Sequence, residues 1–188
     1  MKSKQERVRG AGVSKAFMLT ALTGLLAAAL YWWPEYKEGY APALPSLILF
    51  INLYALALFD IRSFRLPNVL TATLFIAGAV FAFILPRFGL ADHLIGGAVG
   101  LVFFPLLNFG YKSLRGRDGI GLGDAKLLAA IGVWLGWQGL PVVLLVASLT
   151  GLAVGIIGGA SKGGSISQSK IPFGPFLCLG TWIIWLYF

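Results

Sequence analysis

Acidic side chains are rare in this sequence, and the positions of two of them give the first indication of chemistry. Among 188 residues there are seven Asp and Glu. Asp60 ends the apolar run INLYALALFD, and Asp124 begins another apolar run after the glycines of GIGLG. Ionisable groups at the ends of such runs are energetically costly and mark functional sites. The other five fit solvated or helix-capping roles: Glu6, Glu35, Glu38, Asp92 and Asp118.

A pair of aspartates is suited to the hydrolysis of a peptide bond. The ionised carboxylate removes a proton from water, while the protonated one donates a hydrogen bond to the scissile carbonyl. We therefore expect Asp60 and Asp124 to be catalytic. Two simpler interpretations stay open, because Asp124 after Gly123 fits a helix N-cap and Asp60 could form an ion pair with Arg62.

The composition indicates that the elements that carry these residues lie in a membrane. The chain is 58% hydrophobic and 12% charged, whereas soluble domains are about 25% charged. A helix needs roughly 20 apolar residues to cross the hydrocarbon core, and continuous apolar runs predict helices rather than a barrel. We expect one domain over residues 1–188, an all-α polytopic membrane bundle of about seven helices. Six are long spans and the seventh is short: Ser14–Trp33, Leu44–Asp60, Asn68–Pro86, Asp92–Gly110, Gly139–Ala160, Ile171–Phe188 and the short Asp124–Trp137.

The basic residues predict the orientation of this bundle. With residues 1–13 as a cytoplasmic basic tail, only Lys37 and Arg87 fall on the outer side, which satisfies the positive-inside rule. The net charge of +8 then fits anionic lipid headgroups and requires no nucleic acid. The remaining basic residues fall on the cytoplasmic side: Lys2, Lys4, Arg7, Arg9, Lys15, Arg62, Arg65, Lys112, Arg115, Arg117, Lys126, Lys162 and Lys170.

The sequence does not indicate a metal site or a catalytic cysteine or histidine. Cys178 is the single cysteine, which excludes a disulfide frame and a cysteine-paired zinc site. We expect it to be inert packing in the last span. We expect His93 to lie near the outer surface, away from both aspartates and without a role. No metal site is therefore expected.

Three stretches resemble the type IV prepilin peptidases, a family of membrane aspartyl proteases. DIRSFRLPNVLT (Asp60–Thr71) is similar to the family's first-aspartate motif, and GLGDAKLLAAIGVWLG (Gly121–Gly136) to its glycine-x-glycine-aspartate motif. IPFGPFLCLG (Ile171–Gly180) is similar to the start of its last helix. The resemblance covers residues 44–188.

The resemblance implies an activity, a substrate and a location. Asp60 and Asp124 would be the catalytic pair of an aspartic endopeptidase that removes the basic leader of prepilins or pseudopilins. Cleavage would occur at the cytoplasmic face of the bacterial inner membrane, in a pilus or secretion system, and would need no cofactor. Many members carry two Cys-x-x-Cys pairs in a cytoplasmic insert and also methylate the new N-terminus. This chain has a single cysteine, so methyl transfer, with S-adenosylmethionine as cofactor, is uncertain.

Residues next to the two aspartates are expected to bind substrate. Gly121 and Gly123 leave room for a substrate backbone beside Asp124. Pro172, Phe173 and Gly174 could pair with an extended substrate, or they could simply start a helix. Lys126 could hold an acidic substrate group, or it could contact lipid.

Two other functions use the same features. A proton- or cation-coupled transporter would bind its ion at Asp60 and Asp124, although transporters often have internal repeats and none is visible here. A non-catalytic membrane component of a secretion or pilus system would not need both acids. The oligomeric state is not determined by the sequence.

Overall fold

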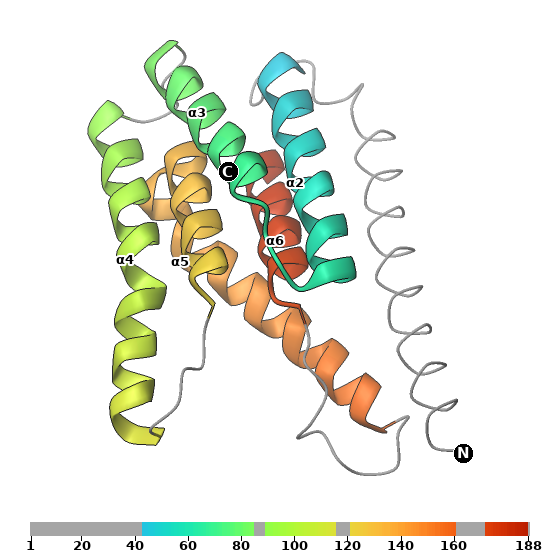
Figure 1. Cartoon of the computed structure of the whole chain (residues 1–188). Helices are drawn as coiled ribbons and strands as arrows, with labels where there is room; N and C mark the ends of the chain where they lie inside the picture. The colour runs from blue at the N-terminus through green and yellow to red at the C-terminus, as the bar shows by residue number, and fades with distance from the viewer. Residues whose placement is uncertain (1–42, 85–88, 116–120, 161–171, 188) are drawn as a thin grey trace.

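The computed structural model describes residues 43–84, 89–115, 121–160 and 172–187. This part of the chain is entirely helical and contains no strand, which confirms the all-α class. Its five helical elements form a bundle around α5 (Figure 1). Their bounds are α2 Ala43–Ser63, α3 Asn68–Ile84, α4 Leu90–Arg115, α5 Leu122–Ala160 and α6 Gly174–Tyr187.

The number of elements differs from the seven helices that the apolar runs predict. The expected span Ser14–Trp33 lies outside the described residues. The expected spans Asp124–Trp137 and Gly139–Ala160 are two halves of the single element α5. The count of seven and the cytoplasmic N-terminus therefore stay predictions.

The helices that carry the two aspartates extend further than the sequence predicts. α2 continues past Asp60 to Ser63, and α5 begins at Leu122, two residues before Asp124. Both aspartates thus lie inside helices, each within one turn of a helix end.

α5 reverses its direction at Gly136. This residue has φ 72° and ψ 173°, a left-handed conformation that glycine adopts without a Cβ clash. The first half of α5 runs up beside α4, and the second half returns downward beside α6 (Figure 1). The expected connection at Gln138–Gly139 is therefore wrong, because both residues are helical and the chain turns before them.

α4 and the first half of α5 approach one another at glycine. A Cβ atom at Gly96 would collide with the backbone carbonyl of Gly132, and one at Gly100 with the carbonyl of Leu128. Small residues at spacing four permit such backbone contact between membrane helices. The glycines at positions 96 and 100 thus allow the backbones of α4 and α5 to touch.

Two buried indole groups connect α2, α3 and α6 to α5. Trp134 Nε1 of α5 donates a 2.8 Å hydrogen bond to the Leu74 carbonyl of α3. Trp185 Nε1 of α6 donates one of 2.8 Å to Ser46 Oγ of α2. The two rings contact each other edge to face, with centroids 5.5 Å apart, and thus link four helices near the centre.

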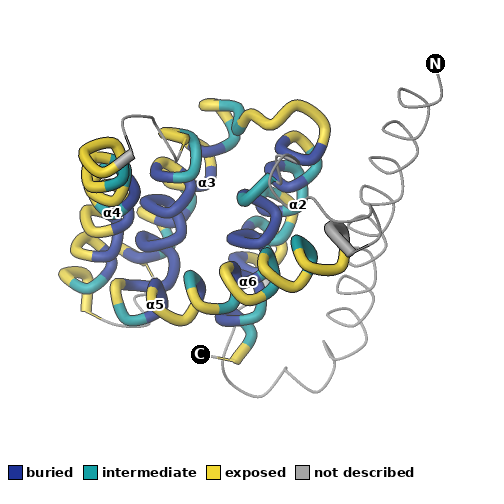
Figure 2. The backbone as a smooth tube through the Cα atoms, turned by 90° about the horizontal axis from the view of Figure 1, so that it is seen from below, coloured by how far each residue is buried: buried dark blue, intermediate teal, exposed yellow. Residues whose placement is uncertain are grey.

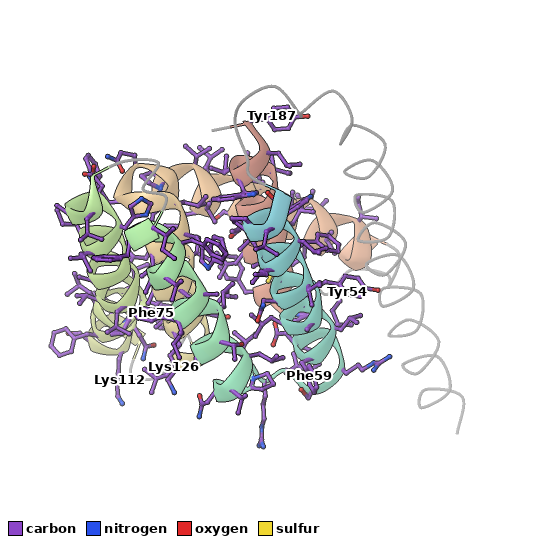
Figure 3. The ribbon with its side chains drawn as sticks, turned by 90° about the horizontal axis from the view of Figure 1, so that it is seen from above. Tyr54, Phe59, Phe75, Lys112, Lys126 and Tyr187 are labelled. Carbon is purple, nitrogen blue, oxygen red and sulfur yellow. The ribbon has the colours of Figure 1, made fainter. Side chains whose placement is uncertain are left out.

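The outward faces of the helices are apolar. Large exposed side chains include Phe83 of α3, Phe109 of α4 and Ile157 of α5, and Figure 3 shows Phe59 of α2 directed away from the bundle. Buried positions line the inner faces (Figure 2). Three segments are long and apolar enough to cross a membrane: Leu44–Ser63, Leu90–Leu114 and Leu122–Ile157. Apolar residues on both the inner and outer faces are characteristic of a membrane protein.

Candidate active site

Asp60 is held inside the bundle by the end of α2. Its side chain is 6% exposed, and the neighbouring Ile61 is buried in the core. The Phe64 N–H donates a 2.8 Å hydrogen bond to the Asp60 carbonyl. Phe64 has φ 53°, a left-handed conformation that commonly terminates a helix. The last turn of α2 therefore directs Asp60 inward before the chain turns away.

The start of α6 contacts the Asp60 carboxyl group directly. The Gly174 N–H donates a 3.0 Å hydrogen bond to Asp60 Oδ2. A Cβ atom at position 174 would lie 2.7 Å from the same oxygen and 3.2 Å from Asp60 Cγ. Only glycine fits this position without displacing the carboxyl group.

Asp124 is the third residue of α5, and it is half-buried. Its N–H donates a 3.2 Å hydrogen bond to the Gly121 carbonyl, which closes the first turn. Ala125 and Leu127, next along the helix, are 2% and 0% exposed. Packing of these neighbours on the core holds the start of α5 in place and, with it, the Asp124 side chain.

The neighbours of the two carboxyl groups place both acids at the same end of the bundle. The Gly174 N–H of α6 binds Asp60, and Gly123, beside Asp124, faces Leu66 in the connection that follows α2. The end of α2 and the starts of α5 and α6 lie at a similar height in Figure 1, above the lower end of α4. Three helix ends thus bring together two acids that are 64 positions apart in the sequence.

The two simpler interpretations of these aspartates do not fit the structure. Asp124 follows two helical residues, so Gly121 and not Asp124 stands before the helix. Arg62 is exposed whereas Asp60 is buried, and no salt bridge joins these two described side chains.

The glycines beside Asp124 have different surroundings. Gly121 is exposed, and among the described residues a Cβ atom there would meet only the Gly123 nitrogen, at 4.0 Å. A Cβ atom at Gly123 would lie 3.5 Å from Leu66. No other described residue therefore crowds Gly121, whereas Gly123 faces the connection between α2 and α3.

The segment before α6 lies partly in the core. Pro172 and Phe173 are half-buried. Phe173 packs edge to face on Phe104 of α4, with ring centroids 6.0 Å apart. Phe173 therefore has a packing role, in addition to its proximity to Gly174.

Lys126 points away from the two acids. It follows Asp124 by two residues, which rotates its side chain by about 200° around the helix axis. Its Nζ donates a 2.9 Å hydrogen bond to Asn68 Oδ1 of α3. The structure does not bring Lys126 together with Asp60 and Asp124.

Two interactions near the acids were not predicted from the sequence. The contact between Gly174 and Asp60 joins residues 114 positions apart. Cys178 lies one helical turn after Gly174, on the same face of α6, and is 4% exposed. The spacing of four residues places Gly174 and Cys178 on one face of α6. The sequence does not show that this face packs against Asp60, so the spacing alone could not assign either residue to the site.

His93 lies near the start of α4, at the end of the bundle away from both aspartates, and its side chain is buried, at 2% exposure. Its Nδ1 lies 2.9 Å from the Val133 carbonyl, so it contributes to the packing of α4 on α5. Within the described residues, no cluster of three His, Cys, Asp or Glu side chains could hold a metal ion.

Comparison with known proteins identifies related sequences. Residues 47–156 match the type IV leader peptidase family. A prepilin leader peptidase/N-methyltransferase of Aeromonas hydrophila is 42% identical over 171 residues, which are 90% of this chain and 57% of the relative. Proteins of the same name from Pectobacterium carotovorum subsp. carotovorum and Xanthomonas campestris pv. campestris are 37% and 32% identical, over 85% and 97% of this chain.

The chain is shorter than these relatives. It spans 55% of the Pectobacterium protein and 63% of the Xanthomonas protein. No solved structure matches the chain significantly.

Proposed function

This chain belongs to the type IV leader peptidase family, and we propose that it is an aspartic endopeptidase of the membrane with Asp60 and Asp124 as its catalytic residues. The observation that carries the proposal is the meeting of the end of α2 with the starts of α5 and α6, where the Gly174 N–H binds Asp60 and Gly123, beside Asp124, faces Leu66. Two acids at one such site, one buried and one half-buried, suit a shared proton.

In the proposed reaction, one water molecule lies between the two carboxyl groups. One carboxylate takes a proton from the water, whose oxygen attacks the carbonyl carbon of the scissile peptide. The protonated partner donates a hydrogen bond to the carbonyl oxygen, and a proton then passes to the leaving amine. Two carboxyl groups that share a proton in this way act as a unit.

Gly174 has a positioning role in this reaction. Its N–H binds Asp60 Oδ2, which orients the carboxyl group and leaves Oδ1 for the water molecule. The missing Cβ allows this close approach.

The proposed substrate is a prepilin or pseudopilin, because the relatives are named prepilin leader peptidases. We propose that its basic leader is removed at the cytoplasmic face of the inner membrane. The substrate backbone would pass Gly121, which is exposed and is not crowded by the described residues, with Gly123, Pro172 and Phe173 beside it. The proposal covers peptide cleavage and not the methyl transfer that the relatives' names include.

Conservative substitution of each acid tests the proposal. The chain is co-expressed with a prepilin, and leader removal is followed by immunoblotting for wild type, Asp60→Asn and Asp124→Asn. Because general acid–base catalysis contributes about 10²–10⁴-fold, we expect each variant to lose processing by at least 10²-fold at unchanged membrane abundance.

Asp92→Asn is the matched control. Asp92 begins α4 at the opposite end of the bundle, where its Oδ1 accepts a 2.9 Å hydrogen bond from Trp137 Nε1. The same loss of charge there should leave processing intact. Full processing by either Asp60→Asn or Asp124→Asn would reject the catalytic pair, and altered ion uptake without processing would favour a transporter.

A further inference from the structure

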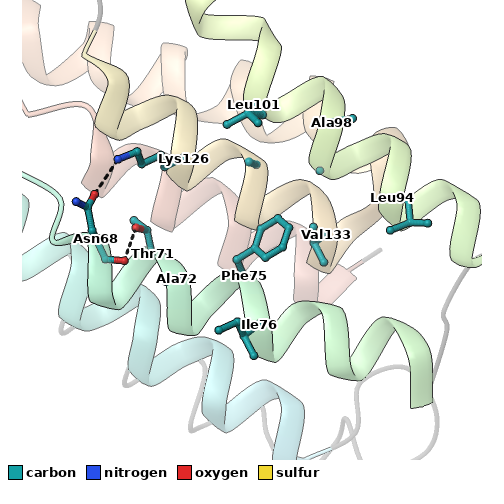
Figure 4. A pocket seen from close by; sticks show the side chains of 12 residues that line it. Asn68, Thr71, Ala72, Phe75, Ile76, Leu94, Ala98, Leu101, Lys126 and Val133 are labelled. Carbon is teal, nitrogen blue, oxygen red and sulfur yellow. Dashed lines mark hydrogen bonds between the residues drawn. The ribbon is translucent and has the colours of Figure 1, made fainter.

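A groove between α3 and α4 lies on the side of α5 away from Asp124. Its volume is about 560 Å³. Asn68, Lys126 and Leu101 lie at one end, and Ile76, Leu94 and Val133 lie at the other (Figure 4). No residue of the proposed catalytic pair lines it.

The groove exists because α3 and α4 pack on α5 rather than on each other. Between them, small residues of α4 and α5 form the floor, including Gly97 and Ala129. Phe75 of α3 reaches toward α4, since a Cβ atom at Gly97 would lie 3.8 Å from its ring. The walls are otherwise exposed apolar side chains such as Leu94 and Leu101.

The polar groups of the groove are confined to one end. Lys126 Nζ and Asn68 Oδ1 are joined there by their 2.9 Å hydrogen bond, and Asn68 begins α3. A helix N-terminus carries partial positive charge and free N–H groups. Among the described residues that line the groove, none is acidic and Lys126 is basic, so the polar end that these residues form is cationic and complements an anion.

The length of the groove matches an acyl chain. From Asn68 to Ile76 the helix rises about 12 Å at 1.5 Å per residue, and one leaflet contributes about 15 Å of a hydrocarbon core roughly 30 Å thick. A membrane-spanning helix of a protein partner would need twice this length. Lys126 and Asp124 lie on different sides of α5. The groove at Lys126 is therefore separate from the place beside Asp124 where the scissile bond of a substrate would lie.

We propose that this groove binds an anionic phospholipid, with one acyl chain between α3 and α4 and the phosphate at Lys126 Nζ and the start of α3. The site does not depend on the proposed peptidase function, and lipid binding is measured without any cleavage.

Photo-crosslinking tests the site in the full chain. The protein is reconstituted in phosphatidylcholine nanodiscs with a phosphatidylglycerol that carries a photoreactive group in its acyl chain. Labelling should map to α3 and α4, and unlabelled phosphatidylglycerol should compete, whereas phosphatidylcholine and inorganic phosphate should not. Lys126→Gln should reduce labelling about fivefold, the effect of one cation at an anionic membrane surface.

Three further variants separate charge from shape. Lys126→Arg keeps the cation and should retain labelling. Lys112→Gln makes the same change of charge on α4 outside the groove (Figure 3) and should also retain it. Ala98→Phe fills the groove without changing charge, and should abolish labelling.

Two results would overturn the proposal. One is equal labelling of wild type, Lys126→Gln and Ala98→Phe. The other is capture of a co-expressed prepilin by a photoreactive amino acid at position 98, which would assign the groove to a polypeptide.

Discussion

The contact between Asp60 and Gly174 is the most specific interaction at the candidate active site. The backbone N–H of one helix start binds the carboxyl group at another helix end, at 3.0 Å. A carboxyl group held by a backbone amide has less freedom than one held by a long side chain, because the amide moves only with its helix. The orientation of Asp60 therefore depends on the position of α6.

Gly174→Ala should impair cleavage without unfolding the protein. The added methyl group would lie 2.7 Å from Asp60 Oδ2 and would displace the carboxyl group. Because a displacement of about 1 Å can reduce catalysis about 10²-fold, we expect a loss of this order in prepilin processing at normal membrane abundance.

Gly151→Ala provides the control for this substitution. Its Cβ atom would lie 3.4 Å from the Phe176 ring, an ordinary contact with the same helix α6. Processing should be preserved in Gly151→Ala. If Gly174→Ala processed prepilin as well as Gly151→Ala does, the positioning role of Gly174 would be wrong.

At the scale of the helices, the first half of α5 is the element that positions Asp124. It is buried over nearly its whole length, from Leu127 to Gly136, because α3, α4 and α6 all pack on α5. Close contact with α4 requires glycine on both helices, at Gly96 and Gly132. Separation of α4 from α5 would therefore also move the candidate active site.

Gly96→Ala should destabilise the protein by about 1–3 kcal/mol, the usual cost of overpacking. Its methyl group would meet the Gly132 carbonyl and the backbone of Gly136. Thermal unfolding in detergent, followed by circular dichroism, measures this loss.

Gly110→Ala is the matched substitution on the same helix. A Cβ atom there has nothing within 4 Å, and alanine favours a helix over glycine by up to about 1 kcal/mol. Its stability should equal or exceed that of wild type. Equal melting temperatures for Gly96→Ala and Gly110→Ala would contradict the close packing of α4 on α5.

At the scale of the whole molecule, the helix directions predict which ends share a membrane face. α2 ends at the height where α5 and α6 begin, and α4 ends further down on the same side of the bundle, whereas α3 ends near the start of α4 (Figure 1). The candidate active site therefore lies at one end of the bundle, and the positive-inside rule predicts that this end faces the cytoplasm.

Cysteine accessibility tests this orientation. In a Cys178→Ala background, Ser63→Cys and Ser113→Cys place thiols at the ends of α2 and α4, and Phe83→Cys and Ala91→Cys place them at the opposite end. A membrane-impermeant maleimide added to intact cells should label only the second pair. Labelling of the first pair from outside would reverse the proposed orientation.

Composition and apolar runs were enough to predict the all-helical class and to single out two acids as candidates. Lipid offers no hydrogen-bond partner to the backbone, so long apolar runs must be helical, and this holds for every described element. Asp60 and Asp124 were recognisable because ionisable groups are rare beside such runs.

The positions where helices turn and the faces that meet depend on contacts between distant segments, which the folded bundle shows. α5 reverses at Gly136 and not at Gln138–Gly139, because several glycines there could each permit a turn and packing against α4 and α6 selects one. Gly174 meets Asp60 across 114 positions, whereas Lys126, two residues from Asp124, faces a different groove. Local sequence specifies a helix through hydrogen bonds four residues apart, but the rotation of each helix about its axis depends on contacts with distant segments.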